Sequence, residues 1–329
     1  MRYIDAIKGG FGIINRNWQL VLMHVVMVIL SSIGFIIIVG IPLAIAFIVF
    51  GIDFTEFASL EDILRALKYP SEIISKYFSL FLIVVISFFL YLLTVAILGI
   101  FIFAGSIGII CLSLTDPTMK FSMKLFFEKA KGIFLRLLGF TTLIGIIFII
   151  TAFSLGILGG GIASLVSFAQ SQDSTLALFL GTFFSLILIV IVIIIILGIL
   201  SITLYGIASL GFNETGPFAS VKEAFHYLIE NPSAFWLYTI LFIGYFIASF
   251  LLILLSYPFT ILPVIGAILS FPYQLISYAF ETYLGLTIIA TILIYYYETR
   301  IQIKSSRGIT ETQEGADNFA SRSDFVHRS

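Results

Sequence analysis

Long apolar runs without charge, separated by short polar segments, dominate the pattern of the chain. Residues 18–51, 77–115 and 137–172 contain no Asp, Glu, Lys or Arg. Each run is longer than the ~20 residues that a helix needs to cross a hydrocarbon layer of about 30 Å. This pattern predicts an all-α integral membrane protein with about six transmembrane helices.

The breaks between apolar segments place the edges of these spans. The predicted spans cover 18–50, 77–112, 134–158, 174–207, 234–256 and 264–297. Gly40-Ile41-Pro42 indicates a break in the first span, and Pro272 indicates a bend in the sixth. The pair Gly156 and Gly160 has the spacing that favours close packing of membrane helices.

A short amphipathic segment precedes each odd-numbered span, which predicts a unit of one interfacial helix and one transmembrane hairpin, repeated three times. The apolar stripes are Ile4, Ile7, Phe11, Ile14 and Trp18; then Met119, Met123, Phe126, Phe127, Ala130 and Phe134; then Phe218, Val221, Phe225, Leu228 and Ile229. We expect a membrane domain over 1–304, with repeats of about 1–115, 116–212 and 213–304, and a disordered cytoplasmic tail over 305–329.

Proline and asparagine mark the ends of these segments. Asp116-Pro117 and Gly216-Pro217 place proline where a helix can begin. Asn17 and Asn231-Pro232-Ser233 predict a change of direction into the next span.

The segment Phe218-Ala219-Ser220-Val221-Lys222-Glu223-Ala224-Phe225, followed by a long hairpin, carries a resemblance. The arrangement resembles a set of uncharacterised prokaryotic multi-pass membrane domains, including the membrane domain attached to some glycerophosphodiester phosphodiesterases. The resemblance covers about residues 1–304 and implies an architecture. It implies no activity, because no polar stretch of this chain is long enough to hold the catalytic domain.

The distribution of positive charge predicts the orientation. Of the 17 Lys and Arg residues, only Arg65, Lys68 and Lys76 fall on one side of the predicted spans, and the others fall on the opposite side. Because Lys and Arg accumulate in cytoplasmic loops, both termini should be cytoplasmic, in the cytoplasmic (inner) membrane. The same rule explains where the cationic residues lie, so we expect no nucleic acid as a partner.

Signatures of catalysis and of metal binding are absent from the sequence. The three histidines, His24, His226 and His327, lie far apart, and no HExxH, P-loop or GxSxG motif occurs. The single cysteine, Cys111, lies in an apolar run typical of an inert packing thiol. We therefore predict no catalytic residue, metal site or cofactor.

Glu281 is the one acidic residue placed well inside a predicted span. It shares a helix face with other small or polar residues, namely Gly266, Ser270, Gln274, Ser277 and Gly285. Such a face should turn away from lipid, because a charged side chain in hydrocarbon costs several kcal/mol. Either Glu281 lines a cavity and binds a proton, a cation or an amine with help from Gln274, Ser277 and Ser270, or it is hydrogen-bonded and ties the sixth helix to a neighbour.

Three hypotheses about function follow. The first is a non-catalytic membrane protein that organises lipid or partner proteins at the cytoplasmic face, with Lys120, Lys124 and Lys131 binding anionic headgroups. The second is a transporter or lipid-handling protein with a polar path past Glu281, which discontinuous helices would help to build. The third is a membrane-embedded enzyme. Expected partners are membrane lipids and another membrane or cytoplasmic protein.

Overall fold

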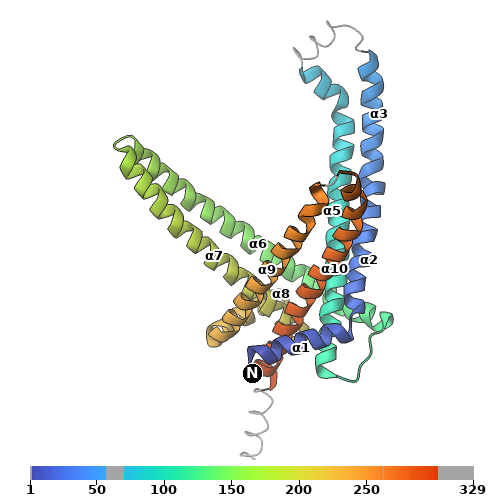
Figure 1. Ribbon diagram of the computed structural model, residues 1–329, viewed down its shortest axis with the longest axis vertical. Helices are drawn as coiled ribbons and strands as arrows, with labels where there is room; N and C mark the ends of the chain where they lie inside the picture. Colours follow the sequence, from blue (N-terminus) through green and yellow to red (C-terminus); the bar gives the residue numbers. More distant parts are fainter. Residues whose placement is uncertain (1, 57–69, 262, 303–329) are drawn as a thin grey trace, which may run out of the picture. The chain divides into compact units, whose positions relative to one another are not determined.

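Helices make up almost all of the part that the computed structural model describes, residues 2–56, 70–261 and 263–302 (Figure 1). Side chains are described there except at 50–56, 70–76, 258–268 and 301–302. The helices of the first half are α1 (Tyr3–Arg16), α2 (Gln19–Phe35), the π-helix η1 (Ile36–Gly40), α3 (Ile41–Glu56) and α5 (Pro70–Thr115). Those of the second half are α6 (Met123–Gln170), α7 (Ser174–Asn213), α8 (Pro217–Glu230), α9 (Pro232–Ile261), α10 (Pro263–Tyr296) and the π-helix η2 (Tyr297–Gln302).

Six helical segments among the described residues are long and apolar enough to cross a membrane, as the sequence predicts. They are Gln19–Val49, Tyr77–Thr115, Met123–Gln170, Ser174–Asn213, Pro232–Tyr257 and Leu269–Arg300. Large apolar side chains on them face outward, for example Phe153 at 71% and Leu178 at 74% exposure. Exposure of this apolar surface to water would cost free energy, whereas contact with lipid hydrocarbon does not.

The chain divides into two compact units. Unit 1 contains Met1–Leu20 and Ala104–Ser329, and unit 2 contains Val21–Phe103. Within unit 2, the ring of Phe35 packs edge-on against Tyr91, with 5.2 Å between ring centroids. The predicted boundaries of the three repeats stay a prediction, and the predicted tail, 305–329, lies outside the described residues.

The predicted break at Gly40-Ile41-Pro42 is wrong, because the helix continues through it. The backbone N–H of Ile41 donates to the carbonyl of Ile36, five residues back, which is the hydrogen bond of a π-turn. A proline lacks the N–H that bonds four residues back and its ring crowds that carbonyl. The wider turn before Pro42 absorbs both effects, so α2, η1 and α3 follow one another without a loop. The helix α10 also continues through Pro272, where the predicted bend stays a prediction.

Glycines bring helices of unit 1 together, although not the predicted pair. A Cβ atom at Gly105 would lie 2.5 Å from the ring of Phe126, and one at Gly206 would lie 2.5 Å from the ring of Phe140. Both rings are fully buried, so α5, α6 and α7 approach where a ring covers a glycine. At Gly156 and Gly160, by contrast, an added Cβ meets no atom of the described residues within 4 Å, so this pair makes no close helix contact among them.

The first and third predicted lead-in segments are separate helices, α1 and α8. As predicted, α1 ends before Asn17, and α8 begins at Pro217 and ends before Asn231. The second is continuous with its span, and the predicted start at Asp116-Pro117 is wrong. Asp116 instead accepts hydrogen bonds from Thr118, and α6 begins later, with its first turn capped by Ser122.

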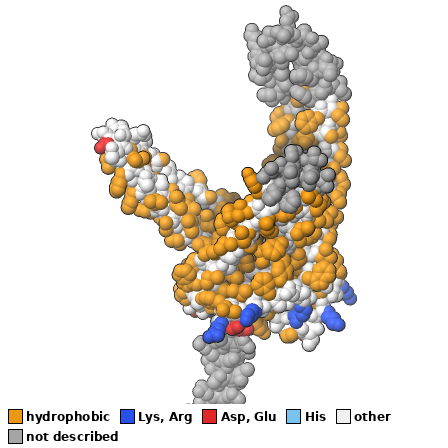
Figure 2. Space-filling view, viewed as in Figure 1, with side chains coloured by type: hydrophobic (Ala, Val, Ile, Leu, Met, Phe, Trp, Pro, Cys, Tyr) orange, Lys and Arg blue, Asp and Glu red, His pale blue; other side chains and the backbone are white. Residues whose placement is uncertain are grey.

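One end of unit 1 gathers its charged side chains. We call this end, formed by α1, α8, η2 and the 116–122 connection, the polar end. Figure 2 shows Lys, Arg, Asp and Glu side chains beside α1, whereas hydrophobic side chains cover the flanks above it. The helices α6 and α7 connect this end to a turn at Ser171–Asp173. There the Asp173 carboxylate caps α7 by accepting a hydrogen bond from the Thr175 N–H.

Candidate functional site

The helices α9 and α10 enclose a groove of about 430 Å³, which we call the α9–α10 groove. Its walls are Leu252, Ile253 and Ser256 from α9 and Ser270, Tyr273, Gln274, Ser277, Tyr278 and Glu281 from α10. The hydroxyl of Tyr273 donates to the backbone carbonyl of Leu252, which holds the two helices together beside the groove. A volume in this range accommodates a small organic ligand or part of a lipid.

The structure brings all four predicted polar-site residues to this one groove. Ser270, Gln274, Ser277 and Glu281 all line it, because their spacings of four, three and four residues place them on one face of α10. Gly266 falls in the stretch 258–268, outside the described side chains. Gly285 lies one turn beyond Glu281 and is not part of the wall.

Glu281 lies in this wall without a polar partner among the described residues. Its side chain is partly buried, and among the described residues it has no hydrogen-bond or ion-pair partner. The hydroxyl oxygen of Ser277, one turn away, is buried and also lacks a partner. Buried polar groups in folded proteins are almost always paired, so two unpaired groups on one wall indicate a place where another molecule supplies the partner.

The position of Glu281 along α10 sets its depth. Tyr296, at the polar end, lies 15 residues after Glu281, which corresponds to about 22 Å along a helix that rises ~1.5 Å per residue. In a hydrocarbon layer about 30 Å thick, a carboxyl at that distance from the polar end lies well within the layer. In such a layer water is scarce, so a carboxyl at this depth would need a cation or a hydrogen-bond donor beside it.

The three predicted headgroup-binding lysines do not form a pocket. Lys120 lies in the 116–122 connection, and Lys124 and Lys131 lie on α6. All three side chains are exposed, and none has a hydrogen-bond or ion-pair partner among the described residues. Their role in binding anionic headgroups stays a prediction.

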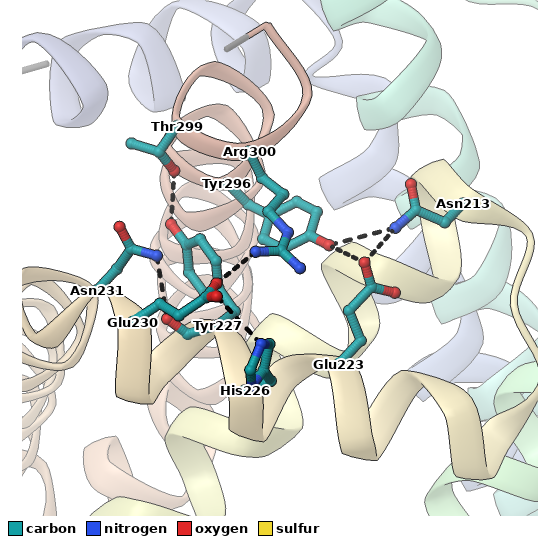
Figure 3. A network of polar contacts seen from close by, with 9 residues as sticks. All are labelled: Asn213, Glu223, His226, Tyr227, Glu230, Asn231, Tyr296, Thr299 and Arg300. Carbon is teal, nitrogen blue, oxygen red and sulfur yellow. Dashed lines mark hydrogen bonds and ion pairs between the residues drawn. The ribbon is translucent and has the colours of Figure 1, made fainter. Parts of the chain in front are cut away.

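The polar end holds a network of side chains that joins α7, α8 and α10 (Figure 3). At its centre, the carboxylate of Glu223 on α8 accepts hydrogen bonds from Ser209 at 2.6 Å, Asn213 at 2.9 Å and Tyr296 at 3.2 Å. Burial acts to raise the pKa of Glu223, but these hydrogen bonds and the nearby charge of Arg300 outweigh it. The pKa of Glu223 therefore lies below its ordinary value.

A second part of the network fastens η2 to the same helix (Figure 3). Arg300 donates to Glu230 at 2.6 Å, and His226 contacts the other oxygen of Glu230 at 3.0 Å. The hydroxyls of Tyr227 and Thr299 share a hydrogen bond of 2.6 Å, and burial raises the pKa of Tyr227. These contacts join protein groups to one another, so the network stabilises the polar end and leaves few of its polar groups available to bind a ligand.

Interpretation of the sequence alone missed this network. Glu223, Tyr227 and Glu230 lie on the face of α8 opposite the apolar stripe that the sequence predicts. In the structure Tyr227 is buried and Glu223 is partly buried, whereas Glu230 is exposed. Phe218 of the apolar stripe, at 77% exposure, turns outward. The sequence does place polar residues on α8 and at the ends of α7 and α10. In a membrane protein these three segments lie near the same membrane surface, so contacts among their polar residues could have been predicted.

Metal ligands and known relatives add no further assignment. Among the described residues, no three His, Cys, Asp or Glu side chains lie close enough to hold a metal ion. Comparison of the chain with protein-family models, with curated proteins and with solved structures finds no match. The resemblance to the membrane domain of some glycerophosphodiester phosphodiesterases stays a prediction.

Proposed function

We propose that the chain is a multi-pass protein of the cytoplasmic membrane with both termini in the cytoplasm. Six apolar helices and an outward-facing apolar surface support the membrane location. The excess of Lys and Arg near the termini and in the 116–122 connection and the start of α6 supports the orientation. In this proposal the polar end lies at the cytoplasmic surface.

We further propose that the protein is a non-catalytic lipid-handling protein, which binds an amine-bearing lipid in the α9–α10 groove. The observation that carries this proposal is the carboxyl of Glu281 in the groove wall, which has no partner among the described residues. A lipid amine brings both a positive charge and N–H donors, and so satisfies a carboxylate that the protein leaves unpaired. The apolar part of the wall, which includes Leu252 and Ile253, suits the rest of a lipid.

The alternative role of Glu281, a hydrogen-bonded tie between α10 and a neighbouring helix, receives less support. Such a tie needs a donor on another helix, and no described residue supplies one. The tie between α9 and α10 beside the groove is made instead by Tyr273. Loss of the Glu281 charge should therefore affect ligand handling more than folding.

The proposal is tested by lipid movement in liposomes. The probe is an aminophospholipid with a free amine and a fluorophore on its acyl chain, whose transfer between leaflets is followed by quenching from outside. We expect the wild type and Glu298→Gln to accelerate transfer and Glu281→Gln not to do so, at equal protein yield. Glu298 is a matched control, since it lies in η2 outside the groove wall. Equal transfer by all three proteins would contradict the proposal.

A second function, the organisation of lipid or partner proteins at the cytoplasmic face, is favoured by a separate observation. Apolar side chains on α1 and α8 face outward at the polar end, among them Ile4 at 62%, Phe225 at 55% and Ile229 at 62% exposure. We propose that α1 and α8 lie along the membrane surface with these side chains among the acyl chains. Fluorescence of tryptophan introduced at Phe225 should be quenched by bromine on acyl chains; quenching only by water-soluble agents would contradict this placement.

A further inference from the structure

A second hollow, of about 360 Å³, lies where the ends of three helices of unit 1 meet. Its walls are Gly108, Cys111, Leu112 and Thr115 at the end of α5, Glu128, Lys129, Gly132, Ile133 and Arg136 near the start of α6, and Gly211, Phe212 and Glu214 at the end of α7. We call it the Lys129–Arg136 pocket. It is separate from the α9–α10 groove and shares no residue with it.

Two cationic side chains in this wall have donors to spare. The guanidinium of Arg136 uses Nη2 to donate to the carbonyl of Gly132 at 3.0 Å, while its Nη1 is buried with no partner. The Lys129 side chain is partly buried, and among the described residues its ammonium has no hydrogen-bond or ion-pair partner. They lie seven residues apart on α6, so they share one face of the helix.

The acidic residues of the same wall do not neutralise these cations. Glu128 and Glu214 are exposed, and neither forms an ion pair with Lys129 or Arg136. The backbone of Glu214 is in the left-handed region, with φ of 51°, and this conformation ends α7 beside the pocket. The cations therefore lie deeper than the carboxylates, and their unused N–H groups are left for another acceptor.

The pocket lies at the boundary between charged and uncharged residues, where we expect the phosphates of membrane lipids. Arg136 is the last charged residue before the uncharged run 137–172, and Thr115 ends the uncharged run 77–115. In a membrane-spanning chain, the edge between charged and uncharged residues coincides with the headgroup region. An arginine and a lysine together suit the oxygen atoms of a phosphate, the arginine through its planar fork and the lysine as a point charge.

We propose that the Lys129–Arg136 pocket binds a phosphate group, as a lipid headgroup or as free phosphate, through the Lys129 ammonium and the Arg136 guanidinium. This site differs from the exposed lysines Lys120, Lys124 and Lys131, which attract anions without shaping a site. It is also independent of Glu281, so either proposal can fail without the other.

The test compares two double variants on the same helix. In Lys129→Gln with Arg136→Gln both pocket cations are lost, and in Lys124→Gln with Lys131→Gln the same charge is lost from exposed positions. Each protein is released from nanodiscs of phosphatidylglycerol mixed with a phosphate-free galactolipid, and retained lipid is counted by native mass spectrometry. We expect the pocket variant to retain about tenfold less phosphatidylglycerol than wild type, because it lacks two charged donors, and the control variant to resemble wild type.

A parallel arm distinguishes the two sources of phosphate. Inorganic phosphate is added to wild type and the pocket variant in detergent, and the thermal unfolding temperature is followed. A rise for wild type alone shows that free phosphate enters the pocket, whereas selective retention of phosphatidylglycerol without such a rise shows a headgroup site. The proposal is overturned if the pocket variant matches wild type in both arms, or if both double variants lose lipid equally.

A further variant separates binding from folding. Gly132 lines the pocket, and a Cβ added there meets no atom within 4 Å. The first side-chain carbon of Gly132→Leu therefore has room, a leucine favours the helix, and both cations are kept. We expect this variant to unfold at the wild-type temperature or above and to retain less phosphatidylglycerol. Full retention by a well-folded Gly132→Leu, together with full retention by the double variant Lys129→Gln with Arg136→Gln, would overturn the assignment.

Discussion

The hydroxyl of Tyr296 donates a hydrogen bond of 3.2 Å to Oε1 of Glu223 and thereby joins the end of α10 to α8. The same carboxylate accepts hydrogen bonds from Ser209 and Asn213 of α7. One acidic side chain therefore links three helices at the polar end of unit 1.

Removal of this carboxylate should destabilise the protein. Glu223→Ala leaves three donors without their charged acceptor, and we expect a loss of about 1–3 kcal/mol in the free energy of unfolding. His226→Ala on the same helix is the control, since its side chain is 64% exposed and its contact with Glu230 lies at the surface; we expect a change of under about 0.5 kcal/mol. Reversible unfolding in detergent measures both. Equal losses in the two variants would show that Glu223 is no more than a surface group.

Stability should also depend on pH through Glu223. Its pKa is lower in the folded protein than in the unfolded chain, so the ionised carboxylate stabilises the fold above the unfolded pKa. This contribution should be lost as the pH falls through the folded pKa. Unfolding temperatures of wild type and Glu223→Gln should therefore differ most near neutral pH and converge at acidic pH. A constant difference across this range would contradict the account.

Two alanine substitutions on α1, two residues apart and so on opposite sides of the helix, should change stability in opposite directions. A Cβ at Gly10 would lie 2.3 Å from Oγ1 of Thr291 and 2.9 Å from the carbonyl of Thr287, so Gly10→Ala should force α1 away from α10, at a cost of about 1–3 kcal/mol. At Gly12 an added Cβ meets nothing within 4 Å, and Gly12→Ala should stabilise the helix by about 0.5–1 kcal/mol. Thermal unfolding of the two variants decides; a loss at both positions would refute the close crossing.

Much of the fold could be predicted because lipid imposes a simple rule on the sequence. A helix that crosses hydrocarbon needs a long apolar run, so the number of spans followed from uncharged stretches such as 77–115. The ends of α1 and α8 also followed from local chemistry, since Asn17 and Pro217 favour helix ends. The predicted break at Gly40-Ile41-Pro42 was wrong because a membrane helix keeps its backbone hydrogen bonds, here by changing to a π-turn.

The candidate sites could be predicted only where one helix carries the whole pattern. Ser270, Gln274, Ser277 and Glu281 recur on one face of α10, and periodicity alone gathers them. The Lys129–Arg136 pocket depends on the approach of three helices at Gly108 and Gly211, which no spacing within one segment reveals. For the same reason, charge counting favoured the exposed lysines of α6 over the partly buried Lys129.

The orientation of the membrane domain is tested by thiol accessibility. Gln172, at the tip of the α6–α7 hairpin, and Lys124, near the start of α6, are both exposed, and the one native cysteine, Cys111, is buried. In intact cells, we expect an impermeant thiol reagent to label Gln172→Cys directly and Lys124→Cys only after permeabilisation. Wild type supplies the blank, and the reverse labelling pattern would invert the proposed topology.

Native mass spectrometry of the protein released from nanodiscs of an aminophospholipid and phosphatidylglycerol tests the central claim most directly. The comparison is between wild type, Glu281→Gln and Glu298→Gln, all with the Lys129–Arg136 pocket intact. We predict that wild type and Glu298→Gln retain the aminophospholipid, and that Glu281→Gln loses it while keeping its phosphatidylglycerol and its unfolding temperature. Identical lipid content in all three proteins, or a Glu281→Gln protein that loses stability but not lipid, would contradict a ligand at Glu281 and return that carboxyl to a structural role.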